Sequence, residues 1–160
     1  MPPRKDRIAV VLDTNVVLGY YLSRRPQSAT VRVFKLWRDE RKLQLVVSRP
    51  MVDEDLAVLE RLQVGNRQIE LLAARFENRS TVTYVQLGAR PHASRDPNDN
   101  PILATALAGR AKYLVTNDHD LLDIETAEKR KFKFEIVTPA RLLTLLKFDK
   151  DHGSVSLRKR

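Results

Sequence analysis

The sequence predicts an α/β protein, a three-layer α/β/α sandwich around a central parallel sheet of about five strands. Five short apolar runs recur along the chain, and segments of helical length separate them. The runs are continuously apolar rather than alternating, which is typical of strands that are covered on both faces. Strands that alternate with helices form parallel βαβ units.

The chain begins this alternation with strand, helix and strand. Residues 8–12 (IAVVL) are too short and too rich in β-branched residues for a good helix, so they predict a buried strand. Residues 28–42 carry apolar side chains near helical spacing. Residues 43–48 (LQLVVS) predict the second strand, because they are rich in valine and leucine.

Two helices are predicted next. Ser48 stands where a helix cap is expected, Pro50 falls in the first turn, and the helix runs to about Leu62. Gly65 and Asn66 break it. A further helix is predicted from the apolar residues that share one helical face, which are Ile69, Leu72, Ala73 and Phe76.

The second half repeats the pattern around a long loop. Residues 81–87 (TVTYVQL) predict the third strand, and 88–101 predict a loop because they hold Gly, three Pro and several Asx and Ser residues. A small-residue helix follows over 102–111 (ILATALAGRA), and 112–118 (KYLVTND) predict the fourth strand. The fifth strand is predicted at 134–138 (FEIVT).

Thr138 and Pro139 open a last helix that runs to about Lys147. We therefore expect one domain over residues 1–147 and a basic, disordered tail over 148–160.

Composition narrows the function classes. The formal net charge of +9 favours a polyanionic partner such as nucleic acid, although a basic surface also serves solubility. The chain has no cysteine, which excludes disulfides, thiolate nucleophiles and cysteine zinc sites and suits a cytoplasmic protein. No window resembles a membrane span or a signal peptide, so we expect no membrane association.

Acidic residues collect where the strands end and the helices begin. In an open parallel sheet, ligands bind in the crevice beyond the carboxyl ends of the strands. Several carboxylates in one crevice repel one another, and a hard divalent cation with oxygen ligands would compensate. The acids at these positions are Asp13, Asp53, Glu54, Asp55, Asp96, Asp99, Asp118 and Asp120.

Each acid also has a purely structural interpretation. Asp13 can cap a turn or helix, and Asp118 can cap a short helix that ends at Leu122. Asp53 and Asp55 suit the positive end of a helix dipole, and Asp96 suits a turn.

Four stretches together carry a family resemblance. They are "VVLDTNVVL", "VVSRPMVDEDLAVL", "DPNDNPILATALAGRAKYLVTNDHDLL" and "FEIVTPARLL". On these motifs residues 8 to about 146 resemble the PIN-domain nucleases, particularly the toxin-like bacterial members related to VapC. Pro101 departs slightly from the family pattern, because a bulkier apolar residue is common there.

The resemblance implies a divalent-metal-dependent endoribonuclease that hydrolyses RNA phosphodiester bonds. It implies catalytic roles for Asp13, Glu54, Asp99 and Asp118, with a one-residue ambiguity because Asp53 and Asp55 flank Glu54. One or two Mg²⁺ or Mn²⁺ ions would be held by Asp13, Asp99, Asp118 and Asp120. Asn15 and Thr116 would fix these carboxylates by hydrogen bonds. His119 is the one histidine expected near the site.

Polyanion binding needs a basic rim as well as a metal. The candidates for phosphate contact are Arg24, Arg25, Arg49 and Arg95, with Arg90 beside them, although a solvated surface explains each equally well. The resemblance further implies the toxin role of a toxin–antitoxin pair, a small antitoxin partner and a homodimer.

Two rival functions stay open. A phosphatase or phosphotransfer domain would use Asp13 as the nucleophile, but its usual form needs a second Asp two residues on, where this chain has Asn15. A catalytically inactive RNA-binding or assembly module could use the same PIN-like scaffold.

Overall fold

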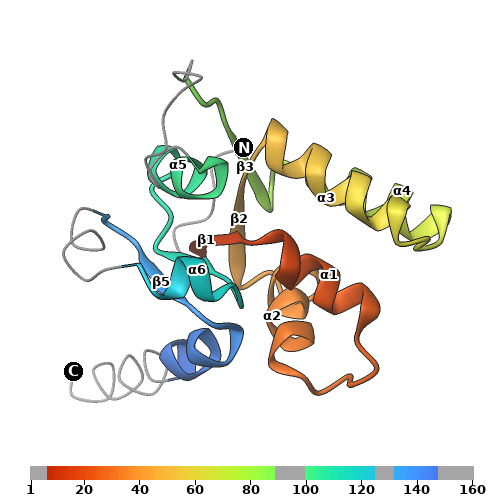
Figure 1. Ribbon diagram of the computed structural model, residues 1–160, viewed down its shortest axis with the longest axis horizontal. Helices are drawn as coiled ribbons and strands as arrows, with labels where there is room; N and C mark the ends of the chain where they lie inside the picture. The colour runs from red at the N-terminus through yellow and green to blue at the C-terminus, as the bar shows by residue number, and fades with distance from the viewer. Residues whose placement is uncertain (1–6, 89–99, 125–131, 148–160) are drawn as a thin grey trace.

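A five-stranded, wholly parallel sheet forms the centre of the molecule (Figure 1). The computed structural model describes residues 7–88, 100–124 and 132–147. The strand order is β3-β2-β1-β4-β5, which places β1 in the middle of the sheet. The predicted α/β fold with about five parallel strands is therefore confirmed. The strands are β1 (Ile8–Leu12), β2 (Leu43–Ser48), β3 (Val82–Val85), β4 (Tyr113–Val115) and β5 (Glu135–Val137).

Helices connect consecutive strands. They are α1 (Thr14–Leu22), α2 (Ala29–Arg38), α3 (Arg49–Arg61), α4 (Asn66–Phe76), α5 (Pro101–Ala108), α6 (His119–Leu122) and a helix over 139–147. The sequence analysis assigns no element to α1. That helix is apolar nearly all round, so no amphipathic pattern marks it, and Asp13 is the one residue between it and β1.

The sheet is covered on both faces. Alternate residues of β1 and β2 point to opposite sides: Val10 and Leu12 join one apolar cluster, whereas Val11 joins the other. The first cluster contains side chains from α1, α2, α3, α4 and the helix over 139–147. The second contains side chains from α5 and α6. This arrangement is the predicted three-layer sandwich.

Helix α5 approaches the sheet closely at its carboxyl end. A Cβ atom placed on Gly109 would lie 2.2 Å from Cγ1 of Val46 in β2 and 3.3 Å from the carbonyl oxygen of Thr105. Val46 is fully buried and β-branched, so it has little freedom to move aside. The glycine therefore allows α5 to pack directly on β2.

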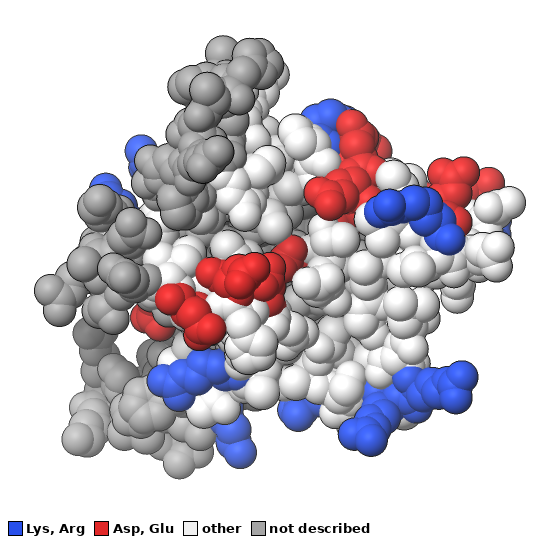
Figure 2. All heavy atoms as spheres, viewed as in Figure 1, with Lys and Arg blue, Asp and Glu red and all other residues white. Residues whose placement is uncertain are grey.

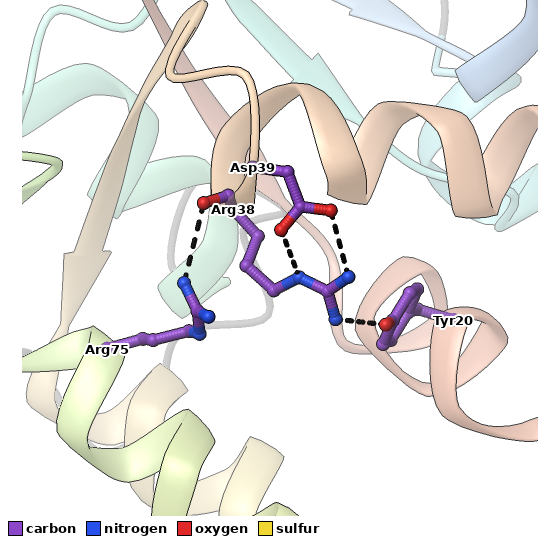
Figure 3. Close-up of polar contacts among 4 residues, drawn as sticks. All are labelled: Tyr20, Arg38, Asp39 and Arg75. Carbon is purple, nitrogen blue, oxygen red and sulfur yellow. Dashed lines mark hydrogen bonds and ion pairs between the residues drawn. The ribbon is translucent and has the colours of Figure 1, made fainter.

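A polar cluster joins α1, α2 and α4 at one edge of their layer (Figure 3). Arg38 forms a two-point ion pair with Asp39, at 2.8 and 2.9 Å, and also donates to Oη of Tyr20. Its guanidinium lies 4.7 Å from the Tyr20 ring centroid. Arg75 of α4 donates to the carbonyl of Arg38 at 3.4 Å. The paired guanidinium lowers the pKa of Asp39, so this acid stays charged beside Arg38.

Several predicted boundaries are too wide. The third strand ends at Val85 rather than residue 87, and the fourth covers only Tyr113–Val115 of the predicted 112–118. The predicted helix over 28–42 ends at Arg38, and Arg41 adopts a positive φ of 53° before β2 begins. Within the described parts of the chain, no helix is long and apolar enough to span a membrane. The predicted tail lies outside the described residues.

Candidate functional site

The carboxyl ends of β2, β1 and β4 lie side by side, and each leads into a segment with acidic residues (Figure 1). Asp13 directly follows β1, and Thr116 to Asp118 follow β4. Helix α3, which carries three consecutive acids, starts directly after β2. Figure 2 shows acidic atoms at the centre of this face, over α6 and the start of α1, and a second acidic group over α3. The sheet topology therefore brings together acids that are distant in sequence.

Asp13 occupies the N-cap position of α1 but does not cap it. Its side chain makes no capping hydrogen bond, and its Oδ2 instead accepts a hydrogen bond from Thr116 Oγ1 at 2.7 Å. Asp13 is only 4% exposed. Burial raises its pKa, the neighbouring carboxylates of Asp118 and Glu54 raise it further, and the Thr116 bond opposes them. The Asp13 carboxylate is therefore turned toward the loop after β4.

Thr116 links the two central loops. Its hydroxyl is fully buried, donates to Asp13 and accepts the backbone N–H of Asp118 at 2.9 Å. Asp118 in turn uses Oδ1 to cap α6 through the N–H of Asp120, also at 2.9 Å. The predicted capping of a short helix ending at Leu122 is therefore confirmed. This cap engages one oxygen of the Asp118 carboxylate.

The three acids of α3 have very different environments. Asp53 and Glu54 are exposed, whereas Asp55 is 3% exposed. Asp55 Oδ1 accepts a hydrogen bond from Thr14 Oγ1 at 2.6 Å. Burial raises the pKa of Asp55 to about 7, and the charges of Asp13 and Glu54 add to this effect. Glu54 is thus near both buried acids while its own side chain reaches solvent.

The sequence suggests for Asp55 a helix-dipole role or the place of Glu54, and the burial of Asp55 is not among the predictions. The helical spacing of the residues around Asp55 indicates that it lies on the buried face of α3. Met51, Val52, Asp55 and Leu59 form the buried stripe of α3. A carboxylate on an otherwise apolar stripe needs a polar partner, and Thr14 supplies it.

The remaining site candidates are more scattered. Asn15 is exposed and has no hydrogen bond to the described residues, and Asp120 and His119 are exposed on α6. Arg24 and Arg25 are exposed beyond the far end of α1, a helix whose nine residues extend about 14 Å from Asp13. Arg49 is exposed in the first turn of α3. The candidates outside the described residues are Arg90, Arg95, Asp96 and Asp99.

The crevice suits a hard cation by its donor chemistry. The groups that shift the pKa of Asp13 include the carboxylates of Asp118 and Glu54, which place further negative charge near it. Carboxylate oxygens are the ligands that Mg²⁺ and Mn²⁺ prefer. Among the residues that the structure describes, no three acidic or histidine side chains converge on one point as a metal site. The predicted ligand Asp99 is not among those residues.

Comparison with known proteins gives one family. A PIN domain model matches residues 9–120, which is more than half of the chain. Among solved structures, the chain is similar to VapBC2 from Rickettsia felis, solved bound to a DNA fragment from their promoter. That similarity has 15% sequence identity and a TM-score of 0.49, and it covers 82% of this chain and 98% of the other. No match is found among curated proteins. The chain belongs to the PIN domain family.

Proposed function

We propose that this protein is a divalent-metal-dependent endoribonuclease that hydrolyses RNA phosphodiester bonds. The observation that carries the proposal is the buried carboxylate of Asp13, held by Thr116 and facing the charges of Asp118 and Glu54. Members of the PIN domain family are generally nucleases, which supports the same function. Several acids at the carboxyl edge of a parallel sheet suit metal-assisted phosphoryl chemistry.

Asp13, Asp99 and Asp118 would hold one or two Mg²⁺ or Mn²⁺ ions, and Asp120 would lie at the outer side. Such ions, when bound, lower the pKa of water and stabilise negative charge on the phosphate. The α6 cap engages Oδ1 of Asp118, so Oδ2 would be the oxygen that binds an ion. The Asp13 carboxylate would bind an ion while it accepts from the Thr116 hydroxyl and the Thr14 backbone.

The Glu54 side chain is exposed, as a group that contacts the attacking water must be. We assign it the orientation of the attacking water, because it is exposed yet close enough to raise the pKa of Asp13. Asp55 is buried beneath it and accepts from Thr14. It would therefore act by positioning Thr14 and the start of α1, without contacting RNA.

The proposed substrate is consistent with the charge of the chain. The net charge of +9 attracts a polyanion, although the crevice itself is acidic. Arg49 lies at the carboxyl edge of the sheet and would contact phosphate there. We retain Arg24, Arg25 and Arg95 as further proposed phosphate contacts.

The test is cleavage of unstructured RNA by the purified chain. We expect cleavage in Mg²⁺ or Mn²⁺, loss of cleavage in EDTA and recovery when the metal is restored. The Asp13→Asn variant serves as the control for a contaminating nuclease. A chain that binds RNA but leaves it intact in both metals would instead support a noncatalytic RNA-binding module.

We also propose, from the motif resemblance, that the protein is the toxin of a toxin–antitoxin pair, with a small antitoxin partner, a homodimeric state and a cytoplasmic location. Induced expression without any partner should stop the growth of a bacterial host, and the Asp13→Asn variant should not. Equal growth with both chains would count against the toxin role.

A further inference from the structure

Tyr84, on the edge strand β3, lies against two arginines from other segments. The guanidinium carbon of Arg49, in the first turn of α3, is 4.9 Å from the Tyr84 ring centroid. That of Arg79, in the loop between α4 and β3, is 4.2 Å away. With Glu77 these residues form the Tyr84 cluster. The Tyr84 ring therefore packs against two guanidinium groups at the β3 edge of the sheet.

The charges of the Tyr84 cluster are not balanced. Glu77 is its one acid and is shared by both arginines, with N–O distances of 3.4 Å to Arg49 and 3.9 Å to Arg79. It also accepts from the Tyr84 hydroxyl at 3.3 Å. The arginine side chains are 57% and 54% exposed, so these long ion pairs add little stability. Among the described residues, several guanidinium N–H donors of Arg49 and Arg79 have no partner and could bind an incoming anion.

Two members of the Tyr84 cluster, Tyr84 and Arg49, lie toward the carboxyl ends of β3 and β2, the edge of the sheet where Asp13 also lies, whereas Glu77 and Arg79 precede β3. Tyr84 is paired in register with Val47, one residue before the carboxyl end of β2, and Arg49 follows that end directly. Strand β3 is two positions from β1, and Asp13 directly follows β1. At the usual spacing of neighbouring strands this separation is about 10 Å. About three stacked nucleotides span it, at about 3.4 Å each.

We propose that the Tyr84 cluster binds the single-stranded RNA that flanks the cleavage position, so that the RNA runs from the crevice across the ends of β2 and β3. This inference rests on the proposed nuclease function and deepens it by adding Arg79 and Tyr84 to the substrate contacts. Aromatic rings and guanidinium planes stack on unpaired bases, and guanidinium N–H groups bind phosphate. An incoming phosphate would replace Glu77 as the partner of the arginines.

The experiment measures RNA affinity in the full chain carrying Asp13→Asn, so that cleavage does not consume the probe. The probes are fluorescent unstructured RNAs of about 12 and about 4 nucleotides. The variants are Arg79→Gln, Tyr84→Ala and Tyr84→Phe. Arg67→Gln is the matched control, because it removes the same charge from an exposed position on α4 that has no ion pair among the described residues.

We expect Arg79→Gln and Tyr84→Ala to weaken binding of the longer RNA about tenfold, which corresponds to the loss of one base stack or charge contact. Arg79→Gln should also reduce the salt dependence of binding by about one unit of slope. Tyr84→Phe retains the ring and should bind like the parent, as should Arg67→Gln. The shorter RNA should be less sensitive to every substitution.

The outcomes separate this inference from the proposed nuclease function. If Arg79→Gln and Arg67→Gln bind RNA equally well while the unsubstituted chain cleaves it, the Tyr84 cluster is not an RNA contact and the nuclease proposal stands. If Arg79→Gln weakens binding but the unsubstituted chain cleaves nothing in Mg²⁺ or Mn²⁺, the contact surface stands and the nuclease proposal falls. If the chain does not bind RNA at all, both are overturned. Arg79 is exposed, so its substitution does not threaten folding.

Discussion

Thr116 Oγ1 donates a 2.7 Å hydrogen bond to Asp13 Oδ2, joining the loops after β1 and β4 although the residues are 103 positions apart. The same hydroxyl accepts the N–H of Asp118. The bond fixes the orientation of a buried carboxylate at the centre of the acidic crevice. Orientation of this kind is what hydrogen-bonding partners of metal-binding carboxylates provide.

Thr116→Val tests that positioning role. The substitution keeps the shape of the side chain and removes the hydroxyl, so Asp13 loses its partner and can rotate. We expect activity or Mn²⁺ affinity to fall about 10- to 100-fold, and stability to fall by about 1–3 kcal/mol because a buried acceptor is left unpaired. Titration with Mn²⁺ separates the two effects. Thr116→Ser should restore metal affinity, and equal affinity in the Val and Ser variants would refute the assigned role.

Asp13→Asn should abolish cleavage without loss of the fold. The amide oxygen can still accept from Thr116, but the charge that would bind the metal is gone. Because burial and neighbouring carboxylates raise the pKa of Asp13, its ionised form is unfavourable in the folded state without metal. We therefore expect the melting temperature in EDTA at pH 8 to rise, by about 2–4 °C for each kcal/mol of strain relieved. A variant that is inactive only because it is unfolded would argue against a catalytic role.

Asp55 should make the metal-free protein less stable as the pH rises. Its pKa is raised from 3.8 to about 7, so between these values the folded state holds a proton that the unfolded state has lost. The stabilisation is complete below pH 3.8 and disappears as the pH rises through about 7. The full effect is at most about 4 kcal/mol, at 1.36 kcal/mol per unit.

Urea unfolding of Asp55→Asn across this pH range isolates the effect. The Asn side chain keeps the acceptor for Thr14 but does not titrate. The free energy of unfolding of the variant, compared with that of the parent chain, should therefore be more favourable at pH 8 than at pH 5. Asp53→Asn, an exposed neighbour on the same helix, is the matched control. If both variants follow the pH dependence of the parent chain, the elevated pKa of Asp55 is wrong.

Tyr20→Phe should lower stability and leave RNA cleavage unchanged. It removes the hydroxyl that accepts from Arg38 but retains the ring under the guanidinium. We expect a loss of about 1 kcal/mol in the free energy of unfolding, typical of one hydrogen bond. Thermal melts measure the expected loss of stability, and a cleavage assay tests whether the activity is unchanged. A fall in kcat would mean that the packing of α1 on α2 affects the crevice.

Much of the architecture is predictable from the sequence, because continuous apolar runs carry local signals. Ser48 stands at the N-cap position of α3 as expected, but its hydroxyl pairs with that of Thr105 and makes no capping bond. Helix α1 is missed because it has no amphipathic pattern and because Asp13 is the one residue that separates it from β1. The predicted ends of the third and fourth strands run past the observed ones into polar residues, such as Gln86 and Thr116.

For the site, position at a strand end is enough to single out Asp13 and Asp118, since sheet topology brings such positions together. Contacts between side chains that are distant in sequence leave no local pattern, so they cannot be predicted from the sequence in the same way. The Thr14–Asp55 bond and the shared use of Glu77 by Arg49 and Arg79 depend on how α3 packs against α1 and β3.

The most direct test of the central claim is a crystal structure of the unsubstituted chain grown with Mn²⁺, with the ion located by anomalous scattering. The account predicts an ion held by carboxylate oxygens of Asp13, Asp99 and Asp118, with Glu54 facing a water beside it. An Mn²⁺ position away from these residues, with the four carboxylates each turned separately to solvent, would contradict it.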